Sequence, residues 1–564
     1  SYRQGQSLYK NFIPKRTEPG KPNDQNELDY STNKPYSWIW ENTINYAHNF
    51  GQHSIGAMVS TTAQEAGGKG FSASAKTFDN EATWSQFFIN AQNFTDIKPT
   101  DWDWKDRNLS YVGRVTYSWA DRYFLTGSYR WDIADRLPLG HRVIGVPGVT
   151  AAWKLSSEPF FHLAGVNLLK IRGSWGRVGN LSTVPTYYGY PLLNNDYSYQ
   201  VGNGAPQSTA LYVGNFTNTN LTWETAEQKD LGLDVSLLKD RLSFTLDYFD
   251  KLTYNLITGQ TLNWPNTYGI GAPLINQGKI QNTGFEFAAT WRDKAGDLGY
   301  ELSANFATLK NRVKYIDQDP NSSWPDGSTW RGTLSPYRSI VGQPYLSYWL
   351  VKTAGIFQTD AEAANYMDKN GNQIQPNAHA GDLKFLKQHN GVGQINDSDR
   401  VYMGSALPKF TYGFTANLSW KRFDLSMFWQ GVAGVKLFHA FKESTLNGAE
   451  QGYNRWDKIL DAWSPTNTKS NIPMIRANDP NNNFQTASDW YLESGNYLRL
   501  KSVVIGYNFP RFYRNTTLRV YVSGDNLITI TKYSGMDPEV GGIGFDGGQF
   551  PLARVYAAGV KLTF

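Results

Sequence analysis

The residues that could carry out chemistry are few, and their spacing does not match a catalytic site. Asp247 and Asp250 lie three residues apart in a stretch of alternating polar and apolar residues. An extended backbone points side chains at this spacing to opposite faces, so the two carboxylates cannot act as a glycosidase pair. No serine or other carboxylate motif stands out, and the chain contains no cysteine. We therefore predict that it is not an enzyme.

A glycine-rich stretch near the carboxyl end also has a non-catalytic interpretation. Gly542–Gly547 matches the Gly-x-Gly-x-x-Gly pattern of dinucleotide-binding loops. In those loops the glycines open a helix whose first N–H groups hold the phosphates. Here the stretch follows Asp537–Val540 and precedes a strand-like segment, so we interpret it as part of a flexible external loop. We expect no cofactor.

The histidines do not indicate a metal site. No two of them have the spacing at which residues of one helix bind zinc. The histidines are His48, His53, His141, His162, His379, His389 and His439.

Aromatic residues and strict alternation dominate the sequence instead. With 34 Tyr, 30 Phe and 20 Trp, the chain is 15% aromatic, which favours strands and membrane interfaces. In the final segment glycine, lysine and threonine alternate with an apolar series. That series comprises Tyr556, Ala558, Val560, Leu562 and Phe564, on one face of an extended strand. An outer-membrane barrel ends in this way, with apolar side chains on lipid and polar ones toward the lumen.

Four earlier stretches repeat the alternation as hairpins with tight turns. They cover residues 111–131, 231–248, 285–306 and 410–429. Aromatic residues stand near the strand ends, where the interfacial girdles of membrane barrels lie. The repeated pattern predicts about fifteen strands over residues 36–564.

Long connections alternate with the tight turns, as in barrels with short periplasmic turns and long external loops. A β-sandwich would not sort its loops in this way. We expect a first external loop over residues 1–35. The other expected external loops cover residues 61–107, 177–222, 312–407, 433–494 and 528–552.

Charge and hydropathy narrow the possible partners. The 54 Lys and Arg residues against 49 Asp and Glu give a net charge of +5 without a basic cluster, so nucleic-acid binding has little support. No run of about eighteen apolar residues exists, so a membrane location requires a barrel that contacts the lipid bilayer through its strands.

Several segments resemble the SusC/RagA-type TonB-dependent transporters of Bacteroidota outer membranes, and the resemblance spans nearly the whole chain. The matching segments are Ser110–Tyr117, Asp121–Tyr123, Leu169–Asn180, Gly278–Glu286, Gly381–Lys384, Tyr497–Lys501, Asp525–Leu527, Tyr533–Val540 and Phe550–Arg554. The resemblance implies an all-β fold, the C-terminal part of a transmembrane antiparallel β-barrel with twenty-two strands. The plug that fills such barrels is not in this sequence.

An open sheet of this kind would expose unpaired backbone groups to lipid at two edges. We therefore expect a second polypeptide, or an N-terminal segment of the same one, to supply the missing strands and the plug.

In this family, the position of residues 388–399 often resembles a calcium-binding loop. Here Gln388 and Val392 occupy the first and fifth ligand positions, which leaves Asn390 and Asp399. An amide and an apolar side chain are poor calcium ligands. We favour a structural turn and expect no metal.

The resemblance implies nutrient uptake across a Gram-negative outer membrane. The cargo would be an oligosaccharide or a peptide, delivered by a SusD-like surface lipoprotein that covers the external loops. The TonB system would supply the energy through an N-terminal part outside this chain. Two alternatives are a protein-export or structural barrel of the same family, and a soluble, secreted, glycan-active β-protein.

Aromatic rings in the expected external loops are our candidates for contact with cargo or lid, because exposed rings stack on sugar faces and peptide side chains. Large loops also need aromatic cores of their own, so each ring has a structural alternative. The candidates are Trp102, Trp104, Tyr187, Tyr188, Trp264, Trp324 and Trp330.

Overall fold

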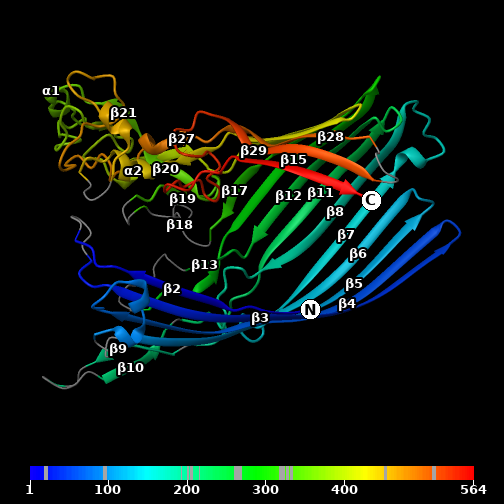
Figure 1. Cartoon of the computed structure of the whole chain (residues 1–564), viewed down its shortest axis with the longest axis horizontal. Coiled ribbons are helices and arrows are strands. Elements are labelled where there is room, and N and C mark those ends of the chain that lie inside the picture. Colours follow the sequence, from blue (N-terminus) through cyan, green and yellow to red (C-terminus); the bar gives the residue numbers. More distant parts are fainter. Residues whose placement is uncertain are drawn as a thin grey trace. The chain divides into compact units, whose positions relative to one another are not determined.

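The computed structural model of the chain is almost entirely antiparallel β-structure (Figure 1). Fifteen strands of nine residues or more occur in the part of the chain that it describes, in agreement with the expected number. The structure describes residues 1–17, 23–92, 98–191, 193–199, 202, 208–214, 216–259, 270–316, 324–325, 330, 334–449, 454–510 and 516–564.

The chain divides into two compact units. Unit 1 comprises Ser1–Ala151, Ser174–Gln228 and Leu252–Lys279, and unit 2 comprises Ala152–Gly173, Lys229–Lys251 and Ile280–Phe564. Four strands pass along the chain from one unit into the other. They are β7 (Val143–Lys154), β8 (Val166–Asn180), β11 (Glu224–Leu237) and β12 (Leu242–Tyr254).

Unit 1 is built around three unusually long strands, β3 (Glu27–Phe50), β4 (His53–Lys76) and β5 (Lys98–Trp119), followed by β6 (Tyr123–Ala134). Each is hydrogen-bonded to the next in an antiparallel ladder. The short strands β1 (Tyr2–Gln4) and β2 (Ser7–Ile13) pair with the first half of β3. Smaller pairs are β9 (Leu193–Tyr199) with β10 (Ser208–Val213), and β13 (Ile257–Gly259) with β14 (Leu274–Asn276).

Unit 2 carries a second antiparallel ladder in the strand order β15–β16–β24–β25–β28–β29–β30. A two-residue turn joins β24 to β25, and Lys421 adopts a positive φ of 51° there, as tight hairpin turns require. The strands are β15 (Lys279–Ala295), β16 (Leu298–Thr308), β24 (Phe410–Trp420), β25 (Phe423–Ala433), β28 (Tyr497–Asn508), β29 (Thr517–Thr531) and β30 (Val555–Thr563).

One face of each ladder is apolar and bare, as the alternation predicts. Ladder partners lie on the same face of a sheet, and the register sets Tyr111 opposite Trp131 and Phe414 opposite Trp429. Phe414 remains 40% exposed and Val560 on β30 69% exposed. The predicted barrel-type pattern is therefore confirmed, because these rows are not buried against a second sheet. No helix of the described residues is long and apolar enough to cross a membrane.

The long connections of unit 2 are not irregular loops but fold together. We call residues 310–409, 434–496 and 532–554 the loop assembly. Its strands are β17 (Lys310–Tyr315), β18 (Trp324–Pro325), β19 (Tyr337–Ser339), β20 (Ser347–Val351), β21 (Thr353–Ile356), β22 (Leu383–Phe385), β23 (Arg400–Gly404), β26 (Lys436–Phe438) and β27 (Leu492–Ser494). Its helices are α1 (Asp360–Ala364) and α2 (Phe441–Leu446).

Two expected loops are wrong in their secondary structure. Residues 1–35 contain β1, β2 and the start of β3, and residues 61–107 contain the end of β4 and the start of β5. Glycines 67, 68 and 70 suggested a loop, but they make room for rings. A Cβ on Gly70 would lie 2.0 Å from the ring of Trp102, which is directly opposite in the ladder. The glycines therefore belong to a strand that carries large aromatic partners.

Candidate functional site

Four of the candidate aromatic residues lie in unit 1, and their surroundings differ. Trp102 and Trp104 are on β5, where each ring lies over a glycine of β4. The backbone N–H of Lys105 donates a hydrogen bond of 2.8 Å to the Tyr187 hydroxyl. Of this group, Trp102 keeps a substantial exposed surface, at 37%.

Tyr188 belongs to a hydrophobic core instead. It is only 6% exposed and packs with residues such as Leu137 and Leu221. Its hydroxyl accepts a hydrogen bond of 2.7 Å from the N–H of Leu274, and burial raises the pKa of this hydroxyl. The ring therefore joins separate connections of unit 1 rather than facing a ligand.

The remaining candidates fall in other places, so the structure does not bring the seven together. Trp330 lies in the loop assembly of unit 2, where its Nε1–H donates to Glu443 Oε2 at 2.8 Å and its ring packs near Phe545. Trp324 begins β18, with its Cα paired to Ser339. Trp264 lies outside the described residues.

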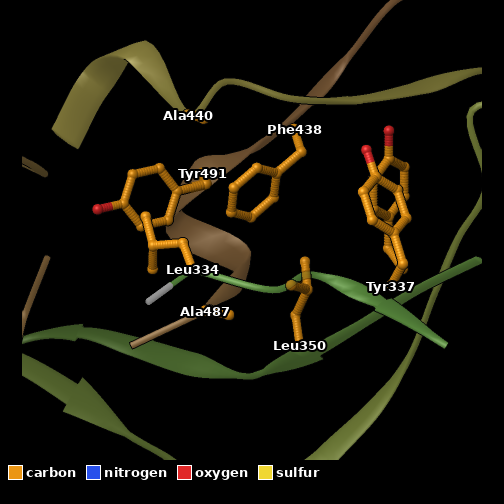
Figure 2. Packing of buried hydrophobic residues seen from close by; sticks show 8 residues of the cluster. Leu334, Tyr337, Leu350, Phe438, Ala440, Ala487 and Tyr491 are labelled. Atoms are coloured by element: carbon orange, nitrogen blue, oxygen red, sulfur yellow. The ribbon is translucent and has the colours of Figure 1, made fainter. Parts of the chain in front are cut away.

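An aromatic core holds the loop assembly together (Figure 2). Phe438 of β26 lies between Tyr491 and Tyr348, with ring centroids 5.1 and 6.4 Å away. Tyr337, Tyr348 and Tyr491 are almost fully buried. Burial raises the pKa of the Tyr348 hydroxyl far above its ordinary value, so it stays protonated and acts as a hydrogen-bond donor.

This core explains the glycine-rich stretch Gly542–Gly547. The Tyr348 hydroxyl donates to the Gly544 carbonyl at 2.9 Å, and Tyr337 donates to the Ile543 carbonyl at 3.1 Å. Gly544 has a positive φ of 73°, and a Cβ there would lie 2.5 Å from the Tyr348 hydroxyl. The pattern therefore reflects close packing of a loop on tyrosines, without a helix start that could hold a phosphate.

A buried charge cluster ties three parts of the loop assembly together. Glu493 of β27 accepts hydrogen bonds from the Ser534 hydroxyl at 2.7 Å and the Ser534 N–H at 2.8 Å. The Lys442 ammonium of α2 lies 2.6 Å from the same carboxylate, and His439 Nδ1 lies 3.4 Å away. Burial alone would raise the pKa of Glu493, but the His439 hydrogen bond and the Lys442 charge outweigh it and lower that pKa.

The stretch 388–399 forms a closed turn around Asp399. Its carboxylate accepts backbone hydrogen bonds from Gln388 at 3.0 Å, His389 at 2.9 Å and Asn396 at 2.9 Å. The Lys387 ammonium lies 2.8 Å away and is itself nearly buried. Donors therefore surround this carboxylate, in the arrangement of the structural turn that we favoured.

Ion pairs join strands of unit 2 on their polar face. Arg172 of β8 bridges Asp234 of β11 and Asp247 of β12 at 3.1 and 2.6 Å. Farther along, Asp424 of β25 pairs with Arg519 of β29. Asp247 alternates with exposed Leu246 and Tyr248, so the charges and the bare apolar rows occupy opposite faces. Such a face suits a water-filled lumen.

A small cavity in the loop assembly was not predictable from the sequence. Its volume is about 210 Å³, and its walls include Phe441 and Trp456 together with Arg455 and Asp546. The wall residues come from two stretches that lie about ninety residues apart in the chain. No local motif connects them.

The comparisons with known proteins agree with this architecture. The family described as "TonB dependent receptor-like, beta-barrel" matches residues 2–527. The chain therefore belongs to the TonB-dependent receptor β-barrel family. This is a family of outer-membrane receptors and transporters, not of enzymes.

Individual relatives are similar over about half of their own length. TonB-dependent receptor P3 of Formosa agariphila is 28% identical, over 93% of this chain and 52% of the relative. TonB-dependent receptor SusC of Bacteroides thetaiotaomicron is 23% identical, over 94% of this chain and 50% of the relative. The chain thus spans about half the length of these curated relatives.

Solved structures show the same fold. The RagAB peptide transporter structure superposes with a TM-score of 0.80 at 20% identity, covering 100% of this chain and 59% of the other. A structure of the RagAB peptide importer in an "open-open" state gives 0.77 at 21% identity, covering 100% of this chain and 59% of the other. The predicted relationship to SusC/RagA-type barrels is confirmed.

Proposed function

We propose that this chain forms barrel wall and external loops of an outer-membrane importer, which takes up an oligosaccharide or a peptide delivered by a SusD-like surface lipoprotein. One observation carries the proposal. Strands with a bare apolar face and a charged opposite face lead, in unit 2, into a loop assembly with its own hydrophobic core. A wall with one apolar and one charged face suits lipid on the outside of a barrel and water on the inside.

The folded loop assembly supports the part of the proposal that concerns a lid. Loops that served only as connections would carry few buried side chains, whereas these bury Tyr337, Tyr348 and Tyr491 almost completely. A rigid surface binds a partner with a smaller loss of conformational entropy. Exposed Trp102 of unit 1 is a further candidate for contact with lid or cargo.

TonB coupling and the plug belong to the proposal as parts supplied from outside this chain. Within unit 1, Trp40–Phe50 of β3 pair with β4 along one edge. The other edge of this segment has no strand partner among the described residues. A strand edge in lipid needs a partner for its backbone groups. Further strands from the same or another polypeptide would provide that partner.

The test is purification of the full-length protein from outer membranes in mild detergent, followed by mass spectrometry of its companions. We expect a surface lipoprotein to co-purify, with an oligosaccharide or peptide released on denaturation. A secreted protein as the main companion would instead indicate export. Recovery of the protein in the soluble fraction without detergent would overturn the membrane assignment.

A TonB-deficient strain tests the energy source separately. Uptake of the released ligand should be lost in that strain, while the ligand and the lipoprotein should still co-purify with the barrel. Undiminished uptake without TonB would contradict active transport.

A further inference from the structure

A lysine-lined groove in unit 2 is not explained by the architecture alone. It has a volume of about 840 Å³ and lies where the loop assembly meets the ends of β24, β25 and β28. Sixteen residues line it, and they include four lysines but no aspartate or glutamate. The lysines are Lys310, Lys352, Lys409 and Lys436.

These lysines differ from three lysines of the same loop assembly that lie in ion pairs. Lys387 pairs with Asp399 at 2.8 Å, Lys442 with Glu493 at 2.6 Å and Lys384 with Glu362 at 3.1 Å. The four groove lysines make no ion pair within the part of the chain that the structure describes. A carboxylate therefore neutralises each of these three lysines, whereas the four ammonium groups of the groove have no such partner among the described residues.

The strand register places one side of the groove on the polar face of the wall. Phe410, an apolar residue that is 40% exposed, is paired with Ala433. The neighbouring residues Lys409 and Gly434 fall on the opposite face, and a Cβ on Gly434 would lie 2.7 Å from Lys409 Cβ. The groove thus adjoins the face that carries the ion pairs, not the bare apolar face.

Electrostatics favours an anionic occupant. Four like charges in one concave surface repel one another, and a ligand with several negative groups relieves that repulsion. The groove is large enough for a short oligomer rather than for a single ion.

The rest of the lining favours a sugar over a peptide. The groove contains no arginine, the side chain whose planar fork matches one carboxylate bidentately, whereas lysines act as adaptable point charges. Asn496, Ser405 and Ser494 add amide and hydroxyl groups, which suit sugar hydroxyls. The Asn311 amide is already hydrogen-bonded to Asn282 and to the Tyr345 N–H, at 2.7 Å each. Tyr402 contributes a ring that is 39% exposed and can stack on a sugar face.

We infer that this groove binds an anionic oligosaccharide. The carboxylate or sulfate groups repeated along the sugar chain would pair with the four lysines. The inference rests on the proposed function and narrows its cargo class.

The test measures binding to the purified full-length protein in detergent, at low and high salt. The probes are a sulfated, heparin-derived octasaccharide, neutral maltooctaose and octaglutamate. The groove variant is K310Q/K352Q/K409Q/K436Q. The control is K369Q/K421Q/K469Q/K532Q, which removes the same charge at exposed positions outside the groove. The gel-mobility shift of the folded barrel on heating checks folding.

We expect the sulfated probe to bind more tightly than maltooctaose and to weaken as salt rises, because salt screens exposed charges. The groove variant should bind it at least about tenfold more weakly, given four contacts of modest strength, and the control variant should bind it normally. If the fourfold variant does not fold, the double variants K310Q/K352Q and K409Q/K436Q should each give part of the loss.

Equal binding by the groove and control variants would overturn the inference, as would equal affinity for the neutral probe. Tighter binding of octaglutamate than of the sulfated probe would overturn the assignment to a sugar. These results are separable from failure of the proposed function. Salt-sensitive binding without any uptake in cells would refute import and leave the groove assignment intact. Uptake of neutral sugars alone would support import and refute the groove assignment.

Discussion

At the residue scale, the Glu493–Lys442 pair is a point where one change should have a large effect. Both side chains are at least four-fifths buried, with exposures of 16% and 13%. E493Q leaves the Lys442 ammonium buried without its counter-charge, so we expect a loss of about 3 kcal/mol in the stability of the loop assembly. Pulse proteolysis in urea measures it.

A matched control is the exposed pair Lys421–Asp297, whose side chains are 60% and 67% exposed. D297N should cost less than about 1 kcal/mol. The double variant E493Q/K442M should be more stable than E493Q alone, since it removes the unpaired charge. If the double variant is the less stable of the two, our account of the cluster is wrong.

Asp368 gives the loop assembly a pH dependence of its own. Its carboxylate accepts backbone hydrogen bonds from Gly393 at 2.7 Å and from Asn372 and Asn370 at 2.8 Å. These bonds lower its pKa from the ordinary value of 3.8 to about 2. A lowered pKa stabilises the fold fully above the unfolded value, and that stabilisation is lost as pH falls through the folded value.

We therefore expect the segment around residues 368–393 to become more sensitive to pepsin as pH falls from about 4 to about 2. Cleavage rates should be normalised to an unfolded substrate at each pH. In D368N the segment should be sensitive already at pH 4, with a flatter profile. An unchanged profile in D368N would assign the pH dependence to other groups.

At the element scale, alternation was sufficient to predict the strands. Apolar residues such as Tyr111 and Val115 of β5, and Leu125 of β6, all fall on one face of their strand. This period of two can be recognised without any tertiary information. The strand ends were less predictable. Glycines such as Gly70 usually interrupt strands, and only the ladder shows the Trp102 ring that occupies the space above it.

The two faces of β29 provide a direct test. Val522 is 54% exposed on the apolar face, and its neighbour Ser523 points to the other. V522R should destabilise the barrel in lipid vesicles by about 2–4 kcal/mol if it lies near the bilayer centre, whereas S523R should have a much smaller effect. Urea titrations followed by the gel-mobility shift give both values. Equal effects would mean that the faces are misassigned.

At the scale of the whole molecule, the loop assembly shows where sequence reasoning stops. Its core joins Leu334, Tyr348, Phe438 and Tyr491, residues of two connections that β24 and β25 separate in the sequence. No short-range period links them. Aromatic type and an expected loop position identify the candidate rings, but only the packing distinguishes buried Tyr188 from partly exposed Trp102.

Phe438 tests whether this core supports a partner. F438A removes a fully buried ring, which should cost about 3–5 kcal/mol within the loop assembly. We expect the barrel to insert normally but to co-purify with less lipoprotein. The control L460A truncates a side chain that is 83% exposed and should retain the partner. If F438A makes the loop assembly protease-sensitive but the lipoprotein still co-purifies fully, partner binding does not depend on this core.

The long ribbon of unit 1 has a mechanical consequence. β3, β4 and β5 contain 24, 24 and 22 residues, about 73–79 Å of extended chain at about 3.3 Å per residue. A tilted strand crosses the hydrocarbon with about 10 residues, so more than half of this ribbon stands clear of it. Continuous hydrogen-bonded pairing and the packing of Trp102 and Trp104 over glycines of β4 hold this ribbon together. About fourteen residues of each 24-residue strand would then reach about 45 Å beyond the hydrocarbon, so a large molecule could first contact this ribbon well away from the lipid surface.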